Sequence, residues 1–423
     1  MSDAARGTDR RARDGAPVQL RRTLSESQLV LYGVGVTVGA GIYVLTGTVI
    51  ETTGALAPLS FLVSAILAGL TALSFSELSV RHPRAAGEAL YVRRGLGSAW
   101  LALTVGLAVV VSGTISSAAI VRGFSGYLRV MLDIPDVVVI PAVVLLLTLL
   151  AIWGIRQAVT MAAVLTVIEV GGLLLIIWVA RDGFLELDAW ASSLVISASP
   201  ADLVLLGSGA VLAFFAFIGF EDMVNVAEEV RDVHRVMPRA IIVTLLVTTV
   251  LYVCVTLVAL LAPGAADLAL SEAPLADLYA RSTGSSPLPI VLIGTVAIIN
   301  GALIQIIMGS RVIYGLAEQG DLPEVFGRVH PRTRTPIHAT VLVGAVVAAG
   351  AVLLPLELLA RLASLIVLSV FVLVNISLVR IKRRDTDGPK PDFEVPVAIP
   401  VAGAVTSLVL VVFQLVSFAR AGL

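Results

Sequence analysis

LYGVGVTVGAGIYVLTG, residues 31–47, is the stretch that decides the fold. It is apolar throughout, yet it holds Gly33, Gly35, Gly39, Gly41 and Gly47. Each glycine inside a helix costs about 1 kcal/mol relative to alanine, so the stretch predicts a transmembrane helix that is interrupted at Val38-Gly39-Ala40-Gly41. Irregular backbone at membrane depth is tolerated where it is buried in protein or lines a cavity, which indicates a ligand site. The alternative is close helix packing through small residues.

The composition is that of an integral membrane protein. Of 423 residues, 58% are hydrophobic and 14% are charged, whereas soluble domains average roughly 25% charged residues. The single cysteine, Cys254, excludes an intrachain disulfide and a cysteine-based metal site. The basic residues are dispersed around apolar segments rather than gathered on one face, which argues against nucleic acid as a partner. We therefore predict the lipid bilayer as the environment, with no cofactor and no metal.

Long, largely uncharged runs predict eleven membrane spans. They lie near 27–50, 56–78, 99–121, 137–155, 159–180, 201–229, 239–262, 287–317, 337–354, 358–380 and 396–418. With the N-terminus placed inside, 23 of the 29 Arg and Lys residues fall on the inner side. The positive-inside rule then predicts a cytoplasmic basic tail over 1–26 and, because the span number is odd, an outside C-terminus.

A second interrupted helix is predicted within FFAFIGFEDMVNVAEEV, residues 214–230. Gly219 is followed at once by Glu221 and Asp222, and carboxylates in lipid cost about 2.5 to 3.5 kcal/mol each. We therefore expect a break near Ile218 to Glu221. Because the two breaks fall in spans one and six, we expect two inverted five-helix repeats, 27–180 and 201–383, followed by an additional helix over 396–418.

Two interrupted helices at the midplane predict a site for an α-amino acid. Backbone N–H groups freed at Gly39 to Gly41 would bind the substrate carboxylate, and freed carbonyl groups would bind its amino group. Phe214, Phe217 and Ile218 would form an apolar wall. The predicted substrate-binding residues are Val38, Gly39, Ala40, Gly41, Ile42, Ser112, Phe214, Phe217, Ile218, Gly219 and Asn300. Thr114 and Ser116 of the third span could contribute hydrogen bonds together with Ser112 and Asn300, although helix packing explains these polar residues at least as well.

Glu169 lies about midway along the span 159–180 and is the most informative ionisable residue. A carboxyl desolvated in this way can load and release a proton during transport, so we predict that a proton is the coupling ion. The same residue could instead pair with a basic substrate, help to hold a sodium ion, or pack helices in a permanently protonated form. Glu221 stands at the start of the second half-helix. We predict that it caps this half-helix or takes part in gating, rather than contacting the substrate directly.

Four stretches in order resemble the amino acid–polyamine–organocation (APC) transporters. They are GVGVTVGAGIYVLTG, ELSVRHPRAAGEALYVRRGLG, FFAFIGFEDMVNVAEEVRDVHRVMPRAI and SRVIYGLAEQGDLPEVFGRVHPRTRTP. The resemblance covers nearly the whole chain and implies a fold like that of the bacterial leucine transporter, with discontinuous helices 1 and 6. It also implies uptake or exchange of amino acids or related amines. Members of the family commonly have twelve spans, whereas this sequence has room for eleven.

The sequence thus predicts an all-α polytopic membrane protein that moves amino acids across the cell membrane by alternating access. Polyamine or organic-cation exchange, amino acid exchange and sodium-coupled symport remain alternatives, and an ion channel is a remote one. A membrane enzyme is disfavoured, because the sequence shows no H-E-x-x-H, G-x-S-x-G or P-loop pattern.

Overall fold

The computed structural model describes residues 24–83, 87–129, 132, 134–153, 158–194, 199–318, 320–330, 333, 335–385 and 391–421. Most of the predicted cytoplasmic tail, residues 1–23, lies outside the described residues. Over the described ranges the chain is helical and forms no strand; the one isolated bridge pairs Leu24 with Val230. The fold class predicted from the sequence, an all-α polytopic membrane protein, is confirmed.

Every predicted span falls on a helix or on a broken pair of helices. The helices corresponding to the eleven spans are α2 (Glu26–Thr53), α3 (Ala57–Arg81), α5 (Ala99–Arg129), α6 (Asp136–Trp153), α7 (Ala158–Val179), α9 (Pro200–Phe215) with the 3-10 helix η3 (Phe220–Glu229), α10 (Val233–Leu261), α13 (Leu288–Glu318), α14 (Ile337–Leu353), α15 (Leu356–Arg384) and α16 (Ala398–Ala421).

By length and hydropathy, seven helices within the described residues could each cross a membrane, or eight if the bent pair Val164–Val179 and Arg181–Ser192 is one span. The number is below eleven because α6 and α14 are shorter apolar helices and because the second half of α2 is counted together with α3 as one stretch, Gly41–Arg81. The division into two five-helix repeats stays a prediction.

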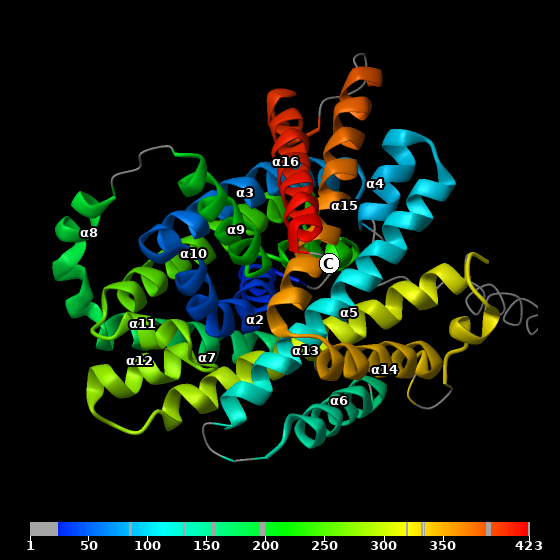
Figure 1. The fold of residues 1–423 in the computed structure, drawn as a ribbon. Helices are drawn as coiled ribbons and strands as arrows, with labels where there is room; N and C mark the ends of the chain where they lie inside the picture. The colour runs from blue at the N-terminus through cyan, green and yellow to red at the C-terminus, as the bar shows by residue number, and fades with distance from the viewer. Residues whose placement is uncertain are drawn as a thin grey trace, which may run out of the picture.

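Helix α2 runs through the middle of the bundle, and the helices that contact it are α10, α7, α13 and α9 (Figure 1). Its apolar residues Val38, Ile42 and Leu45 are fully buried. A helix that is hydrophobic all round is expected in such a central position, because protein surrounds it on every side. The interrupted helix that organises the sequence is therefore also at the centre of the fold.

Short helices connect the spans on both sides. Helix α4 (Gly87–Leu96) connects α3 and α5. The segment between α10 and α13 contains α11 (Ala265–Ala269) and α12 (Pro274–Thr283). A Cβ added to Gly47 of α2 would lie 2.8 Å from the Leu268 carbonyl oxygen, so this segment is packed directly on the second half of α2. The segment is thus a cover on the bundle rather than a surface loop.

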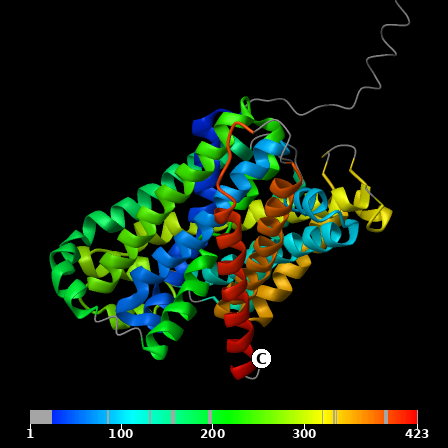
Figure 2. The same ribbon diagram turned by 90° about the horizontal axis from the view of Figure 1, so that it is seen from above.

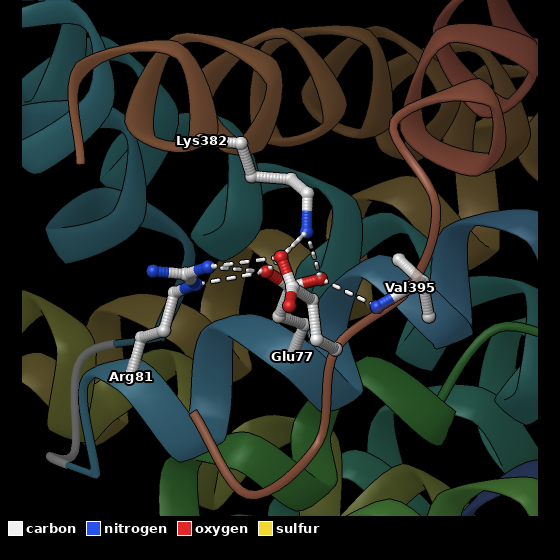
Figure 3. Close-up of polar contacts among 5 residues, drawn as sticks. Glu77, Arg81, Lys382 and Val395 are labelled. Carbon is white, nitrogen blue, oxygen red and sulfur yellow. Dashed lines mark hydrogen bonds and ion pairs between the residues drawn. The ribbon is translucent and has the colours of Figure 1, made fainter. Parts of the chain in front are cut away.

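The last helix, α16, lies beside α15 in both views (Figures 1 and 2). Its connection to the bundle is fixed by Glu77 of α3, which is fully buried. The Glu77 carboxylate accepts hydrogen bonds from Arg81 Nε at 2.8 Å, Lys382 Nζ at 2.8 and 3.0 Å, and the Val395 backbone N–H at 2.9 Å (Figure 3). Four donated hydrogen bonds compensate for the burial of this charge and join α3, α15 and the segment before α16.

Candidate functional site

The first interruption is at the predicted position. Gly39 has φ −23° and ψ −148°, so the helical path of α2 is broken there although helix continues on both sides. Gly39 and Gly41 lie on a small cavity, described below, whereas Val38 and Ile42 are fully buried. Gly39 is the one non-helical residue within α2, so the backbone of Ala40 is helical again; the side chain of Ala40 lies outside the described residues.

The second interruption is also at the predicted position. Helix α9 ends at Phe215, and η3 begins at Phe220. Between them Gly219 has φ +127°, a conformation that glycine adopts readily and that other residues rarely adopt. The half-helix that follows the break is a 3-10 helix instead of the expected α-helix. The tighter helix keeps the acidic residues Glu221 and Asp222 in its first turn.

The two interruptions pack directly against each other. A Cβ added to Gly41 would lie 2.6 Å from Ala216 Cα, and a Cβ added to Gly219 would lie 2.7 Å from Val36 Cγ1 and 2.9 Å from the Val36 carbonyl oxygen. Each glycine of one break therefore faces the backbone of the other helix. No side chain could occupy either contact without moving the helices apart.

Tyr252 of α10 joins the two breaks through their backbone. Its hydroxyl lies 2.7 Å from the Thr37 carbonyl oxygen on α2 and 2.8 Å from the Ala216 carbonyl oxygen next to α9. A phenol has one O–H donor, so it satisfies one of these carbonyls at a time. The sequence predicts that carbonyl groups freed at the breaks bind the substrate amino group. Two of these carbonyl groups, those of Thr37 and Ala216, are contacted here by the Tyr252 hydroxyl.

A cavity of about 20 Å³ lies between the breaks. This is room for about one water molecule, which means that the helices are closed around the site. The lining residues are Val36, Thr37, Gly39, Gly41, Ser116, Ile120, Phe215, Ile218, Gly301 and Gln305. The Ser116 hydroxyl is buried and has no hydrogen-bond partner. We call this space the central cavity.

Only part of the predicted apolar wall faces the central cavity. Ile218 lines it, and so does Phe215, which the sequence analysis does not select. Phe214 packs edge-on against Phe371, with ring centroids 5.8 Å apart, and Phe217 packs against Tyr252 at 5.0 Å. Both rings belong to the aromatic core that holds α9 against α15 and α10.

Glu169 and Asn300, both predicted site residues, contact each other. Asn300 Nδ2 donates to Glu169 Oε1 at 3.1 Å, and Glu169 Oε2 is buried with no hydrogen-bond partner. The Tyr43 hydroxyl, on α2 just beyond the break, donates to the Glu169 backbone carbonyl at 2.6 Å. Tyr127 of α5 in turn donates to the Tyr43 carbonyl at 2.7 Å. The backbone of α7 at Glu169 is therefore linked to the second half of the broken helix by Tyr43, whereas the printed contact of the carboxyl itself is with Asn300.

Glu221 lies at the second break, where its Oε2 accepts the Gly219 N–H at 2.9 Å; its capping or gating role stays a prediction. It also lines a second cavity of about 20 Å³, which we call the inner cavity. Ser112, another predicted residue, lies here and not on the central cavity. The two cavities share Ile218 and Gln305 in their walls, so they are neighbours.

Three buried carboxyl groups line the inner cavity, namely Glu88 of α4 and Glu221 and Asp222 of η3. Asp222 Oδ2 accepts a hydrogen bond from Gln305 Nε2 at 3.1 Å. Helix α4 is a connector outside the apolar spans, and burial raises the pKa of the Glu88 carboxyl to about 8, with the charge of Asp222 adding to the rise. The result is an acidic cavity directly below the central one.

Besides Phe215, the residues that the sequence-based selection misses include Gln305, Tyr252 and Glu88. Gln305 and Tyr252 are polar groups within long apolar runs, which is a signal that the sequence does contain. Glu88 carries no such signal, because it stands in a basic connector where an acidic residue is ordinarily solvated. Its burial is caused by the packing of α4 against η3, where Gly87 lies against Val224.

The family model for amino acid permeases matches residues 24–422. A vacuolar cationic amino acid transporter of Arabidopsis thaliana is 33% identical over 385 residues, which cover 85% of this chain and 59% of the relative. A branched-chain amino acid permease of Bacillus subtilis (strain 168) is 28% identical over 398 residues, covering 88% of this chain and 83% of the relative. A methylthioribose transporter of the same organism is 28% identical over 398 residues, covering 89% and 84%.

The chain thus spans about three fifths of the length of the plant transporter that it matches. With the family match extending over nearly every described residue, this chain belongs to the amino acid permease family.

Proposed function

We propose that this protein is a secondary active transporter that moves amino acids across the cell membrane by alternating access. The observation that carries the proposal is the reciprocal contact of the two broken helices, Gly41 against Ala216 and Gly219 against Val36, around the central cavity. Broken helices supply backbone groups for the charged ends of a zwitterion. Membership of the permease family and the transport functions of the relatives support the same class.

The closed form of the central cavity fits a transporter rather than an open pore. A cavity that holds about one water must widen before an amino acid can enter. The elements able to move are those that meet at the breaks, since each half-helix is joined to the other half only through a short non-helical segment. The cover formed by α11 and α12 packs on the second half of α2 and would have to move with it.

In this proposal the substrate carboxylate binds the N–H groups at Gly39 to Gly41, and the Ser116 hydroxyl provides a polar contact in the same cavity. Phe215 and Ile218 contact the side chain. The amino group competes with Tyr252 for the Thr37 and Ala216 carbonyls, so substrate binding would release a contact that holds the two breaks together. Occupancy of the site and the position of the helices would thereby be coupled.

A proton on Glu169 is the proposed coupling ion. A bare carboxylate at this depth would leave Oε2 buried without a partner, and a proton on that oxygen removes the unpaired charge. Loss of the proton would change the interaction of Glu169 with Asn300, and with it the packing of α7 and α13, both of which contact α2. A sodium ion is the competing coupling ion, and uptake experiments can separate the two.

The test is uptake of labelled amino acids by proteoliposomes under an imposed pH gradient or an imposed sodium gradient. We expect accumulation driven by the pH gradient in the wild type, with Glu169→Gln retaining exchange of labelled for unlabelled substrate but losing accumulation. Accumulation by Glu169→Gln with unchanged pH dependence would refute proton coupling through this residue. Absence of uptake and exchange for every amino acid would refute the transport function itself.

A further inference from the structure

Five exposed arginines lie where α4, α15 and the start of α5 pack on one another (Figure 1). They are Arg93 and Arg94 of α4 and Arg380, Arg383 and Arg384 of α15. A Cβ added to Gly95 would lie 2.5 Å from Ser377 Cα, so α4 and α15 are in direct backbone contact next to Arg94. With a rise of about 1.5 Å per residue, Arg380 is about 4.5 Å and Arg384 about 10.5 Å along α15 from Ser377. The arginines of the two helices are therefore neighbours in space.

His82, at the end of α3, reports a positive potential at this place. It interacts electrostatically with both Arg94 and Asp385, which puts Arg94 beside the end of α15. Burial lowers the pKa of His82 below its ordinary value, and the charges of Arg94 and Arg81 lower it further. The carboxylate of Asp385 acts in the opposite direction, and its effect is the smallest of the four. The arginines thus outweigh the nearby acid.

The buried cations of the same region are paired, whereas the exposed ones are not. Lys382 forms ion pairs with Glu77 at 2.8 Å and with Glu394 at 2.9 Å, and Arg81 pairs with Glu77 at 2.8 Å (Figure 3). None of the five exposed arginines forms an ion pair with an acidic residue of the described chain. Their charges are therefore available to a partner outside the chain.

The arginines stand at the end of helix faces that are apolar and exposed. On α15, the exposed Ile376 is followed one turn later on the same face by Arg380. On α5, Trp100 is 71% exposed and lies on the same face as the exposed Leu107 and Val111. Tryptophan is enriched where the hydrocarbon of a bilayer meets its headgroups. The arginines therefore lie at the level of the lipid headgroups.

We propose that these five arginines, with Trp100 at their border, form a binding surface for an anionic membrane lipid. Arginine presents a planar fork that matches the oxygens of a phosphate group. Clusters of four to eight basic residues at the end of a transmembrane helix attract anionic lipids, and each contributes about fivefold in affinity. The apolar border at Trp100 and Ile376 fits the acyl chains of a lipid, which a free phosphate lacks. The inference goes beyond the proposed function and does not depend on it.

The test measures lipid selectivity at Trp100. The other tryptophans are replaced by phenylalanine, in Trp153→Phe, Trp178→Phe and Trp190→Phe. The protein would be reconstituted in phosphatidylcholine vesicles with equal mole fractions of either phosphatidylglycerol or phosphatidylcholine brominated on the acyl chains, since bromine quenches a neighbouring tryptophan. We expect a relative binding constant about threefold or more in favour of phosphatidylglycerol. It should fall to about one in Arg380→Gln/Arg384→Gln and in Arg93→Gln/Arg94→Gln.

Arg235→Gln/Arg239→Gln is the matched control, because these arginines are also exposed and four residues apart, but on α10. The control should keep the wild-type selectivity, and Arg380→Lys/Arg384→Lys, which keeps the charge, should keep most of it. Equal binding of the two lipids by the wild type, unchanged selectivity in the α4 and α15 variants, or an equal loss in the α10 control would overturn the proposal. Loss of selectivity on adding inorganic phosphate at constant ionic strength would also overturn it, because the surface would then bind free phosphate.

Discussion

Gly41 of α2 lies so close to Ala216 that a Cβ on the glycine would be 2.6 Å from the alanine Cα. Because the neighbour is backbone, it cannot rotate away, and Gly41→Ala should force the two breaks apart at a cost of about 1–3 kcal/mol. We expect a lower midpoint of thermal unfolding in detergent and at least a tenfold loss of uptake.

The matched control for this substitution is Gly69→Ala in α3, since a Cβ there meets nothing within 4 Å. It should leave uptake unchanged and stabilise the helix by up to about 1 kcal/mol. If Gly41→Ala behaved like Gly69→Ala, the close contact of the broken helices would be unnecessary for function.

Tyr252→Phe removes a hydroxyl that joins the carbonyls of the two breaks. The substitution keeps the ring contact with Phe217 but leaves buried carbonyl oxygens without their donor, at a cost of about 1–3 kcal/mol. We expect a lower unfolding midpoint and altered substrate KM. Tyr279→Phe on α12, which is only half-buried, serves as the comparison and should change stability by less than about 0.5 kcal/mol.

Glu77→Gln tests the cluster that ties α16 to the bundle. Lys382 has a side chain that is 5% exposed, and it would lose its fully buried partner and keep only its ion pair with the more exposed Glu394, at 2.9 Å. Removing one member of a buried ion pair typically costs about 3–5 kcal/mol. Glu357→Gln, which breaks the more exposed pair with Arg361, should cost at most about 1 kcal/mol. Equal unfolding midpoints for the two variants would contradict the structural role of Glu77.

Both interruptions could be predicted from the sequence, because their cause is local. Glycines in an apolar run mark the first, and a glycine followed by two carboxylates marks the second. The contact between Glu169 and Asn300 could not be predicted, although both residues could be named, because it joins positions 131 residues apart. The orientation of Phe214 and Phe217 could not be predicted either, since where a helix breaks, tertiary packing decides which side chains face inward.

The central claim is that substrate binds between the two broken helices. Ser116 lines the cavity between them, so a label at this position tests the claim directly. In a Cys254→Ser background, Ser116→Cys would place a thiol on the central cavity, and Ser192→Cys on exposed α8 would serve as the control. The rate of modification by a small thiol-specific reagent would be measured in proteoliposomes with and without the amino acid that gives the highest uptake. The account predicts that saturating substrate slows modification at Ser116→Cys at least fivefold and leaves Ser192→Cys unaffected. Equal rates at Ser116→Cys with and without substrate, in a variant that still transports, would contradict it.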